Sequence, residues 1–247
     1  MSDLRVGVIG AGVMGSGIAQ CLAAAGYELV CCDVAEPALE RARQEVVTGR
    51  FGLESAVARG KLTRAQLEAA IARLTWSTSL EMAAAADLIV ECVPERLDLK
   101  IRVFRELDRL AKPTAILASN TSGFSIAVLA ACTGRPERVI GWHWASPPPV
   151  MKLAEIVATD QTSQSTIETV VEVAAACGKN PVVVKDTAMS WGFVANRIYF
   201  AMLREAQRVV AEGIATREQV NQLMVDAYRW PVGPFAMVSG AQTGWQK

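Results

Sequence analysis

The segment LRVGVIGAGVMGSGIAQ, residues 4–20, decides the fold class of the chain. A short apolar run ends in glycines spaced G-x-G-x-x-G at Gly10, Gly12 and Gly15, and an apolar helical pattern follows. In this context Gly10 permits a tight turn, Gly12 lets the backbone approach a pyrophosphate, and Gly15 lets helix and strand pack closely. The helix N-terminus, at Met14, would supply backbone amides to the anion.

Asp33 ends the next strand-like run of the sequence. A carboxylate there accepts hydrogen bonds from ribose hydroxyls, and its charge repels a 2′-phosphate. We therefore expect a dinucleotide site that takes NAD rather than NADP. The alternative is a glycine turn kept for steric reasons, with Asp33 as a solvated strand end.

Short apolar runs alternate with helical patterns through the first part of the chain, which indicates a parallel, doubly wound sheet with right-handed crossovers. Two further strand-like runs, 138–143 and 151–157, are joined by only seven residues, too few for a parallel crossover, so we expect them to run antiparallel. After residue 185 the pattern is helical. The sequence thus predicts a Rossmann-like α/β domain over 1–187, mostly parallel, and a small all-α domain over 188–247. The expected strands are 4–9, 28–33, 87–92, 115–118, 138–143, 151–157 and 181–185, and the expected helices are 14–25, 36–73 with breaks at Gly49, Gly52 and Gly60, 95–110, 165–177, 188–212 and 216–228.

The composition narrows the function classes. The chain has 247 residues, 51% of them hydrophobic, and its 25 basic and 25 acidic side chains leave no net charge. Neutrality argues against nucleic acid or an anionic membrane as a partner. The N-terminus lacks the pattern of a signal peptide, and no apolar run is long enough to span a membrane. The six cysteines have no metal-ligand spacing, so we expect a cytoplasmic protein without a metal.

His143 is the only histidine of the sequence. If the two strands around the proline-rich loop are antiparallel, Glu155 lies close to it. A carboxylate bonded to one ring nitrogen fixes the tautomer, and the other nitrogen can then take a substrate proton. The alternative is a half-buried strand histidine that pairs with a surface glutamate.

Several segments, in this order, resemble the L-3-hydroxyacyl-CoA dehydrogenase family over essentially the whole chain: GVIGAGVMGSGIA, IVECVPERLDLK, ASNTSGFSI, GWHWASPPPVMKLAEIV, NRIYFAMLREA and RWPVGPF. The run PPVMKLAEI, residues 148–156, favours members that act on acyl-CoA, such as 3-hydroxybutyryl-CoA dehydrogenases. The resemblance implies an NAD-dependent oxidoreductase of fatty acid metabolism that interconverts (S)-3-hydroxyacyl-CoA and 3-oxoacyl-CoA, and it implies a homodimer.

The resemblance also implies roles for individual residues. His143 would be the general base and Glu155 would orient it, while Ser122 and Asn196 would contact substrate. Glu95, Lys100 and Asn120 would join the glycine loop and Asp33 around the cofactor. For Glu95 and Lys100 the alternative is a solvated helix start, and for Ser122 it is a cap on the following helix.

Basic residues exceed acidic ones between positions 41 and 73, which suits the phosphates of CoA. We expect Arg50, Arg59 and Lys61 to bind them, although a solvated helical face would show the same pattern.

The sequence departs from the family in three places. Ser146 stands where the family has asparagine, so its contact with substrate would be weaker or mediated by water. The stretch 186–193 is three residues longer than its family counterpart and adds Trp191, which together with Trp142 and Trp144 would line an aromatic acyl pocket or belong to the core. The helical domain is shorter than that of the family. Two alternatives to the leading function therefore stay open: the same chemistry on another 3-hydroxy acid or an acyl-carrier-protein thioester, and a catalytically weak NAD(H)-binding protein.

Overall fold

The computed structural model describes residues 4–187 and 191–242, which form two compact units that divide between Trp191 and Gly192. Within these ranges no helix is long and apolar enough to cross a membrane.

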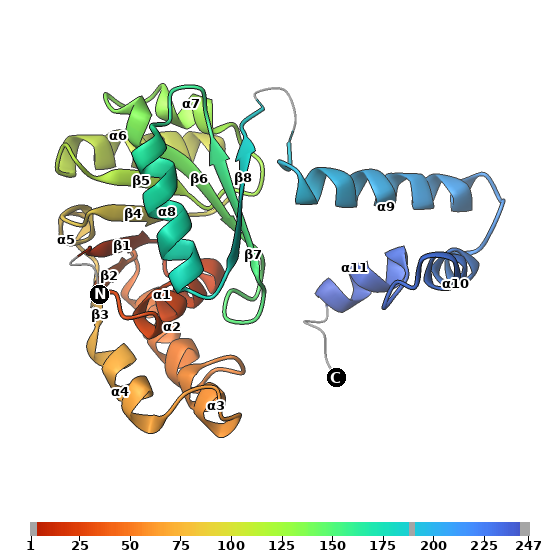
Figure 1. Cartoon of the computed structure of the whole chain (residues 1–247), viewed down its shortest axis with the longest axis horizontal. Coiled ribbons are helices and arrows are strands. Elements are labelled where there is room, and N and C mark those ends of the chain that lie inside the picture. The colour runs from red at the N-terminus through yellow and green to blue at the C-terminus, as the bar shows by residue number, and fades with distance from the viewer. Residues whose placement is uncertain (1–3, 188–190, 243–247) are drawn as a thin grey trace. The chain divides into compact units, whose positions relative to one another are not determined.

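The first unit contains the strands and most of the helices (Figure 1). Its strands are β1 Val6–Ile9, β2 Leu29–Cys32, β3 Leu74–Ser77, β4 Leu88–Glu91, β5 Ile116–Ser119, β6 Val139–Trp144, β7 Leu153–Ala158 and β8 Asn180–Lys185. Its helices are α1 Val13–Ala24, α2 Glu36–Thr48, α3 Leu53–Ala58, α4 Arg64–Ala72, α5 Leu80–Ala84, α6 Leu97–Leu110, α7 Ile126–Ala130, the 3₁₀ turn η1 Pro136–Arg138, and α8 Gln164–Ala176. The second unit contains α9 Ala195–Ala211, α10 Arg217–Tyr228 and α11 Pro234–Gln242.

Eight strands of the first unit form one sheet in the order β3-β2-β1-β4-β5-β6-β7-β8. All neighbours are parallel except β6 and β7, which run antiparallel. Helices α1 and α8 cover one face, and α5, α6 and α7 cover the other (Figure 1). The predicted fold class, including the antiparallel part after residue 138, is confirmed.

The differences from the predicted elements are local. The sequence pattern did not reveal β3, α5, α7 or α11, which are short or lie in runs of small residues with no clear period. The expected helix 188–212 begins only at Ala195, because Gly192 and Phe193 have positive φ and interrupt a helix there; residues 188–190 lie outside the described ranges. The predicted breaks at Gly49, Gly52 and Gly60 do separate α2, α3 and α4.

The glycine-rich turn joins β1 to α1 by close backbone contacts. Gly10 has φ +100°, which favours glycine, and a Cβ on Gly15 would lie 1.8 Å from the carbonyl oxygen of Gly10. A Cβ on Gly12, in contrast, would meet no atom within 4 Å. Gly15 is therefore required by packing, whereas Gly12 borders open space.

This contrast predicts different stabilities for two matched variants. Gly15→Ala forces the turn apart and should lower the free energy of unfolding by about 1–3 kcal/mol, as measured by urea denaturation. Gly12→Ala, at the N-cap of α1, should cost less than about 1 kcal/mol. Equal losses in the two variants would contradict this account of the turn.

Candidate active site

The pair of His143 and Glu155 lies at the antiparallel junction of the sheet. Strand β6 pairs with β7 so that these two residues are directly opposite each other. His143 Nδ1 lies 2.7 Å from Glu155 Oε2, and the residues are 5% and 3% exposed. Glu155 is thus a buried partner rather than a surface glutamate. A buried carboxylate on Nδ1 stabilises an imidazolium and leaves Nε2 as the nitrogen that can exchange a substrate proton.

Asp33 is held at the carboxyl end of β2 by two backbone amides. Its Oδ2 accepts from Ala11 N at 2.8 Å, and its Oδ1 accepts from Ala35 N at 3.0 Å. The first contact ties Asp33 to the glycine-rich turn. The carboxylate is therefore preorganised beside the turn rather than solvated at random.

A cavity of about 560 Å³ lies along this turn and is lined by Gly12, Asp33, Arg41, Phe51 and the prolines of the loop after β6. The N-cap of α1 is Gly12, which has no side chain to cap the amides at the start of the helix, and Met14 lies in the first turn of that helix. An open helix N-terminus, a glycine that borders space and a fixed carboxylate together fit the pyrophosphate and ribose of a dinucleotide.

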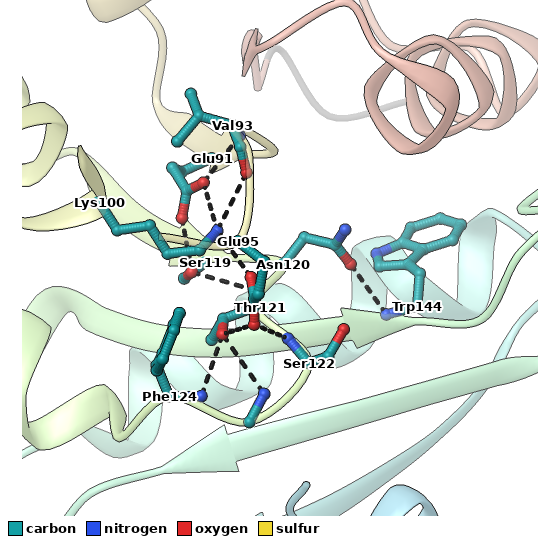
Figure 2. Close-up of polar contacts among 11 residues, drawn as sticks. Glu91, Val93, Glu95, Lys100, Ser119, Asn120, Thr121, Ser122, Phe124 and Trp144 are labelled. Carbon is teal, nitrogen blue, oxygen red and sulfur yellow. Dashed lines mark hydrogen bonds and ion pairs between the residues drawn. The ribbon is translucent and has the colours of Figure 1, made fainter. Parts of the chain in front are cut away.

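Lys100 lies between two carboxylates, those of Glu91 and Glu95, as Figure 2 shows. It is 1% exposed, and its Nζ lies 2.8 Å from Glu91 Oε1 and 3.2 Å from Glu95 Oε2. Burial raises the pKa of Glu91, and the Lys100 ammonium together with hydrogen bonds acts against that rise. Lys100 is therefore not part of a solvated helix start.

Glu95 connects this ion pair to the turn after β5. Its Oε1 accepts from the Thr121 hydroxyl at 2.6 Å and from Ser122 N at 2.9 Å (Figure 2). Glu95 thus fixes the turn that carries Ser122 through these two hydrogen bonds. The N-cap position of the following helix, α7, is Ser125 rather than Ser122, and the amide of Ala127 at the start of that helix donates to Asp186 Oδ2.

Asn120 binds the strand that carries His143. Its Oδ1 accepts from Trp144 N at 3.0 Å, and its backbone N donates to the Glu91 carbonyl oxygen at 2.9 Å (Figure 2). The ends of β4, β5 and β6 are joined in this way, next to the catalytic candidate His143.

The proline-rich loop between β6 and β7 is held by Lys179, which sequence reasoning missed. This lysine is 7% exposed, donates to the carbonyl oxygens of Pro148 and Met151, and lies 4.9 Å from the centroid of the Trp144 ring. Ser146 is exposed and precedes a cis peptide bond to Pro147.

The two tryptophans that flank His143 belong to the core. Trp142 and Trp144 lie on the other face of β6, against the layer of α1 and α8, with ring centroids 5.0 Å apart. They line neither the cavity along the glycine-rich turn nor the one beside Arg59 and Lys61. The expectation of an aromatic acyl pocket fails for these two residues because neighbouring side chains of a strand point to opposite faces.

Two of the three basic candidates border a second cavity of about 470 Å³. Arg59 and Lys61 line it together with Lys152 and Lys179, and the described residues around it include no acidic side chain. Arg50 lies nearby, since its carbonyl oxygen accepts from Arg59 at 2.9 Å. Sequence reasoning missed the two lysines because they lie about a hundred residues away along the chain.

Asn196 lies in the first turn of α9, in the second unit, and is described within that unit. Within the described residues, no three side chains of His, Cys, Asp or Glu gather as a metal site.

Comparison with known proteins matches both units to one family. Residues 5–187 match the family model "3-hydroxyacyl-CoA dehydrogenase, NAD binding domain", and residues 192–246 match "3-hydroxyacyl-CoA dehydrogenase, C-terminal domain". A 3-hydroxybutyryl-CoA dehydrogenase of Mycobacterium tuberculosis is 39% identical over 96% of this chain and 82% of its own length. A 3-hydroxyadipyl-CoA dehydrogenase of Escherichia coli is 37% identical over 94% of this chain and 48% of its own length.

Among solved structures, the crystal structure of (S)-3-hydroxybutyryl-CoA dehydrogenase from Ralstonia eutropha superposes with a TM-score of 0.89 at 38% identity. The match covers 96% of this chain and 81% of that one. The chain therefore belongs to the 3-hydroxyacyl-CoA dehydrogenase family, and its first unit carries that family's NAD-binding domain.

Proposed function

We propose that the chain oxidises (S)-3-hydroxyacyl-CoA to 3-oxoacyl-CoA with NAD⁺, and catalyses the reverse reduction, with His143 and Glu155 as its acid–base pair. The observation that carries this proposal is the buried contact of 2.7 Å between His143 Nδ1 and Glu155 Oε2. A protein that only binds NAD(H) has no need of an oriented imidazole.

In this mechanism the pair of His143 and Glu155 transfers one proton. His143 Nε2 takes the proton of the substrate 3-hydroxyl, while Glu155 holds Nδ1–H and stabilises the imidazolium that forms. In reduction, the same imidazolium returns the proton to the oxygen at C3. Ser122 would contact that oxygen from the turn after β5, and Asn196, in the first turn of α9, is proposed as a further substrate contact.

The cofactor site is assigned to the glycine-rich turn. Gly10, Gly12, Met14 and Gly15 would hold the pyrophosphate, and Asp33 would bind the adenosine ribose. NAD⁺, when bound, supplies the acceptor for the hydride of C3. Glu95 and Asn120 would flank its other end, and Lys100, which is buried, would act there through Glu95.

For the CoA part of the substrate, we assign Arg59 and Lys61, with Arg50 beside them, to the phosphates. The support is the second cavity, whose charged lining residues are all basic. The names of the relatives suggest short acyl chains such as 3-hydroxybutyryl, and the exposed Ser146 of the proline loop would contact the substrate weakly or through water.

We further propose a homodimer in the cytoplasm, built from an NAD-binding domain over 1–187 and a helical domain over 188–247. Apolar side chains such as Ile198 and Leu223 are 66% and 63% exposed on the second unit, which suits an interface between copies. The six cysteines are thiols, as in a reducing compartment.

The acid–base assignment predicts a large loss of rate in two variants. His143→Ala and Glu155→Gln should each lower kcat for NADH oxidation with acetoacetyl-CoA by about 10²–10⁴-fold. The Kd of NADH, measured by fluorescence, should stay close to that of the unaltered protein and serves as the control. Unchanged rates in both variants would refute the mechanism, and an unaltered protein that binds NADH without turnover would favour the binding-protein alternative.

The cofactor assignment predicts a change of preference in Asp33→Asn. The amide keeps an oxygen for Ala11 N but loses the charge that repels a 2′-phosphate, so the ratio of the NADPH Kd to the NADH Kd should fall about tenfold or more. The assignment is wrong if the unaltered protein already prefers NADPH.

The CoA assignment predicts a change confined to substrates that carry phosphates. Lys61→Ala should raise KM for acetoacetyl-CoA by about tenfold and leave KM for acetoacetyl-pantetheine unchanged. Arg64→Ala is the matched control, since Arg64 pairs with Glu68 on the exposed face of α4 and should change neither value. Equal effects on both thioesters would remove Lys61 from the phosphate site.

A further inference from the structure

The buried residue Glu91 has a place in the site that the sequence did not suggest. We propose that Glu91 is a positioning residue for the reaction: through Lys100 it fixes Glu95, and Glu95 fixes the turn that carries Ser122. This inference rests on the proposed function, in which Ser122 lies beside the reacting oxygen.

Glu91 is the immobile end of the series. It is fully buried at the carboxyl end of β4, a strand with β1 on one side and β5 on the other. Both of its carboxylate oxygens accept hydrogen bonds: Oε1 from Lys100 Nζ at 2.8 Å and Val93 N at 2.8 Å, and Oε2 from Ser119 Oγ at 2.6 Å (Figure 2). The side chain therefore has a single orientation, set by three different segments.

Lys100 transmits this position to Glu95. It lies in the first turns of α6, and its one ammonium is shared between the buried Glu91 and Glu95, whose side chain is 37% exposed. Nζ also donates to the Val93 carbonyl oxygen at 3.2 Å. Because Glu91 and Val93 hold the ammonium in place, Glu95 Oε2 is fixed beside it, and Glu95 Oε1 faces the turn.

Glu95 holds the turn through Oε1, which accepts from both the Thr121 hydroxyl and Ser122 N. The Thr121 hydroxyl oxygen in turn accepts from Phe124 N at 3.1 Å. Figure 2 shows this continuous series of contacts from Glu91 to Ser122. Its last bond is to the backbone of the residue that we place next to the substrate, so a shift of Glu95 moves Ser122.

Positioning and stability can be separated by removing the ion pair in two ways. Loss of one partner leaves a buried charge without compensation, whereas loss of both often costs little stability. Lys100→Met alone leaves Glu91 without its cation and should lower the thermal midpoint by roughly 10 °C, whereas in Glu91→Gln the ammonium keeps Glu95 as a partner and the loss should be smaller. The double variant Glu91→Gln/Lys100→Met should recover most of that loss. It should still show kcat reduced about 10- to 100-fold with acetoacetyl-CoA, because Glu95 has lost its cation.

A third substitution tests whether the effect passes through Glu95. Glu95→Gln keeps an oxygen for Thr121 and Ser122 but cannot form the ion pair, so it should reproduce the fall in kcat. Added to the double variant, it should lower kcat less than twofold further, since residues that act in series are not additive. Asp108→Asn is the matched control: it breaks the ion pair with Arg135 at the other end of α6, and it should lower the thermal midpoint with kcat unchanged.

Backbone hydrogen exchange supplies a readout that does not need turnover. The peptide that contains residues 120–124 should exchange faster in the double variant and in Glu95→Gln, and not in Asp108→Asn. The proposal is overturned if the double variant recovers both stability and kcat, if the losses of kcat multiply, or if exchange of this peptide stays unchanged. Where the buried variants do not fold, unchanged kcat and unchanged exchange in Glu95→Gln overturn the proposal, because Glu91 can reach the turn only through Glu95. Absence of turnover by the unaltered protein would refute the proposed function, and the exchange result would still decide the role of Glu91.

Discussion

The antiparallel pairing of β6 with β7 is the constraint on which the site depends. In an otherwise parallel order this junction brings residues twelve positions apart in the chain face to face, and it places His143 opposite Glu155 with Nδ1 and Oε2 2.7 Å apart. Both side chains are buried, so the carboxylate acts on the imidazole through a medium that screens it poorly. The loop between the two strands, held by Lys179, closes the hairpin and forms one wall of both cavities.

The remaining site residues of the first unit converge because parallel strands end at one edge of the sheet. Gly10 follows β1, Asp33 follows β2, Glu95 follows β4, and the turn of Asn120 and Ser122 follows β5. Hydrogen bonds between these strand ends fix the loops relative to one another. Asp33 is bonded to the turn after β1, and Asn120 is bonded to the strand of His143.

The sequence allowed most of this arrangement to be predicted. The glycine spacing fixed the βα turn, and the short proline-rich connection was enough to predict that His143 and Glu155 lie close together. Short elements were missed: β3 is only partly buried and α5 has five residues, so neither has enough positions to show a period.

The sequence also did not predict which polar side chains of a helix are buried. The family resemblance implies that Lys100 lies at the cofactor, and the alternative was a solvated helix start; in the structure α6 instead turns Lys100 inward onto Glu91. Glu91 was not singled out in the expected strand 87–92, and its role depends on Ser119 and Lys100, which the sequence does not place beside it. These partners depend on how α6 and β5 pack against β4, which a local sequence pattern does not reveal.

The central claim is that Glu155 fixes one tautomer of His143, with the proton on Nδ1. Because the chain has a single histidine, a sample labelled with ¹⁵N-histidine gives one imidazole in a long-range ¹H–¹⁵N spectrum. At a pH where the ring is neutral, the account predicts a protonated Nδ1 and an unprotonated Nε2. A neutral ring protonated on Nε2 would contradict it, since Nε2 could not then accept the substrate proton.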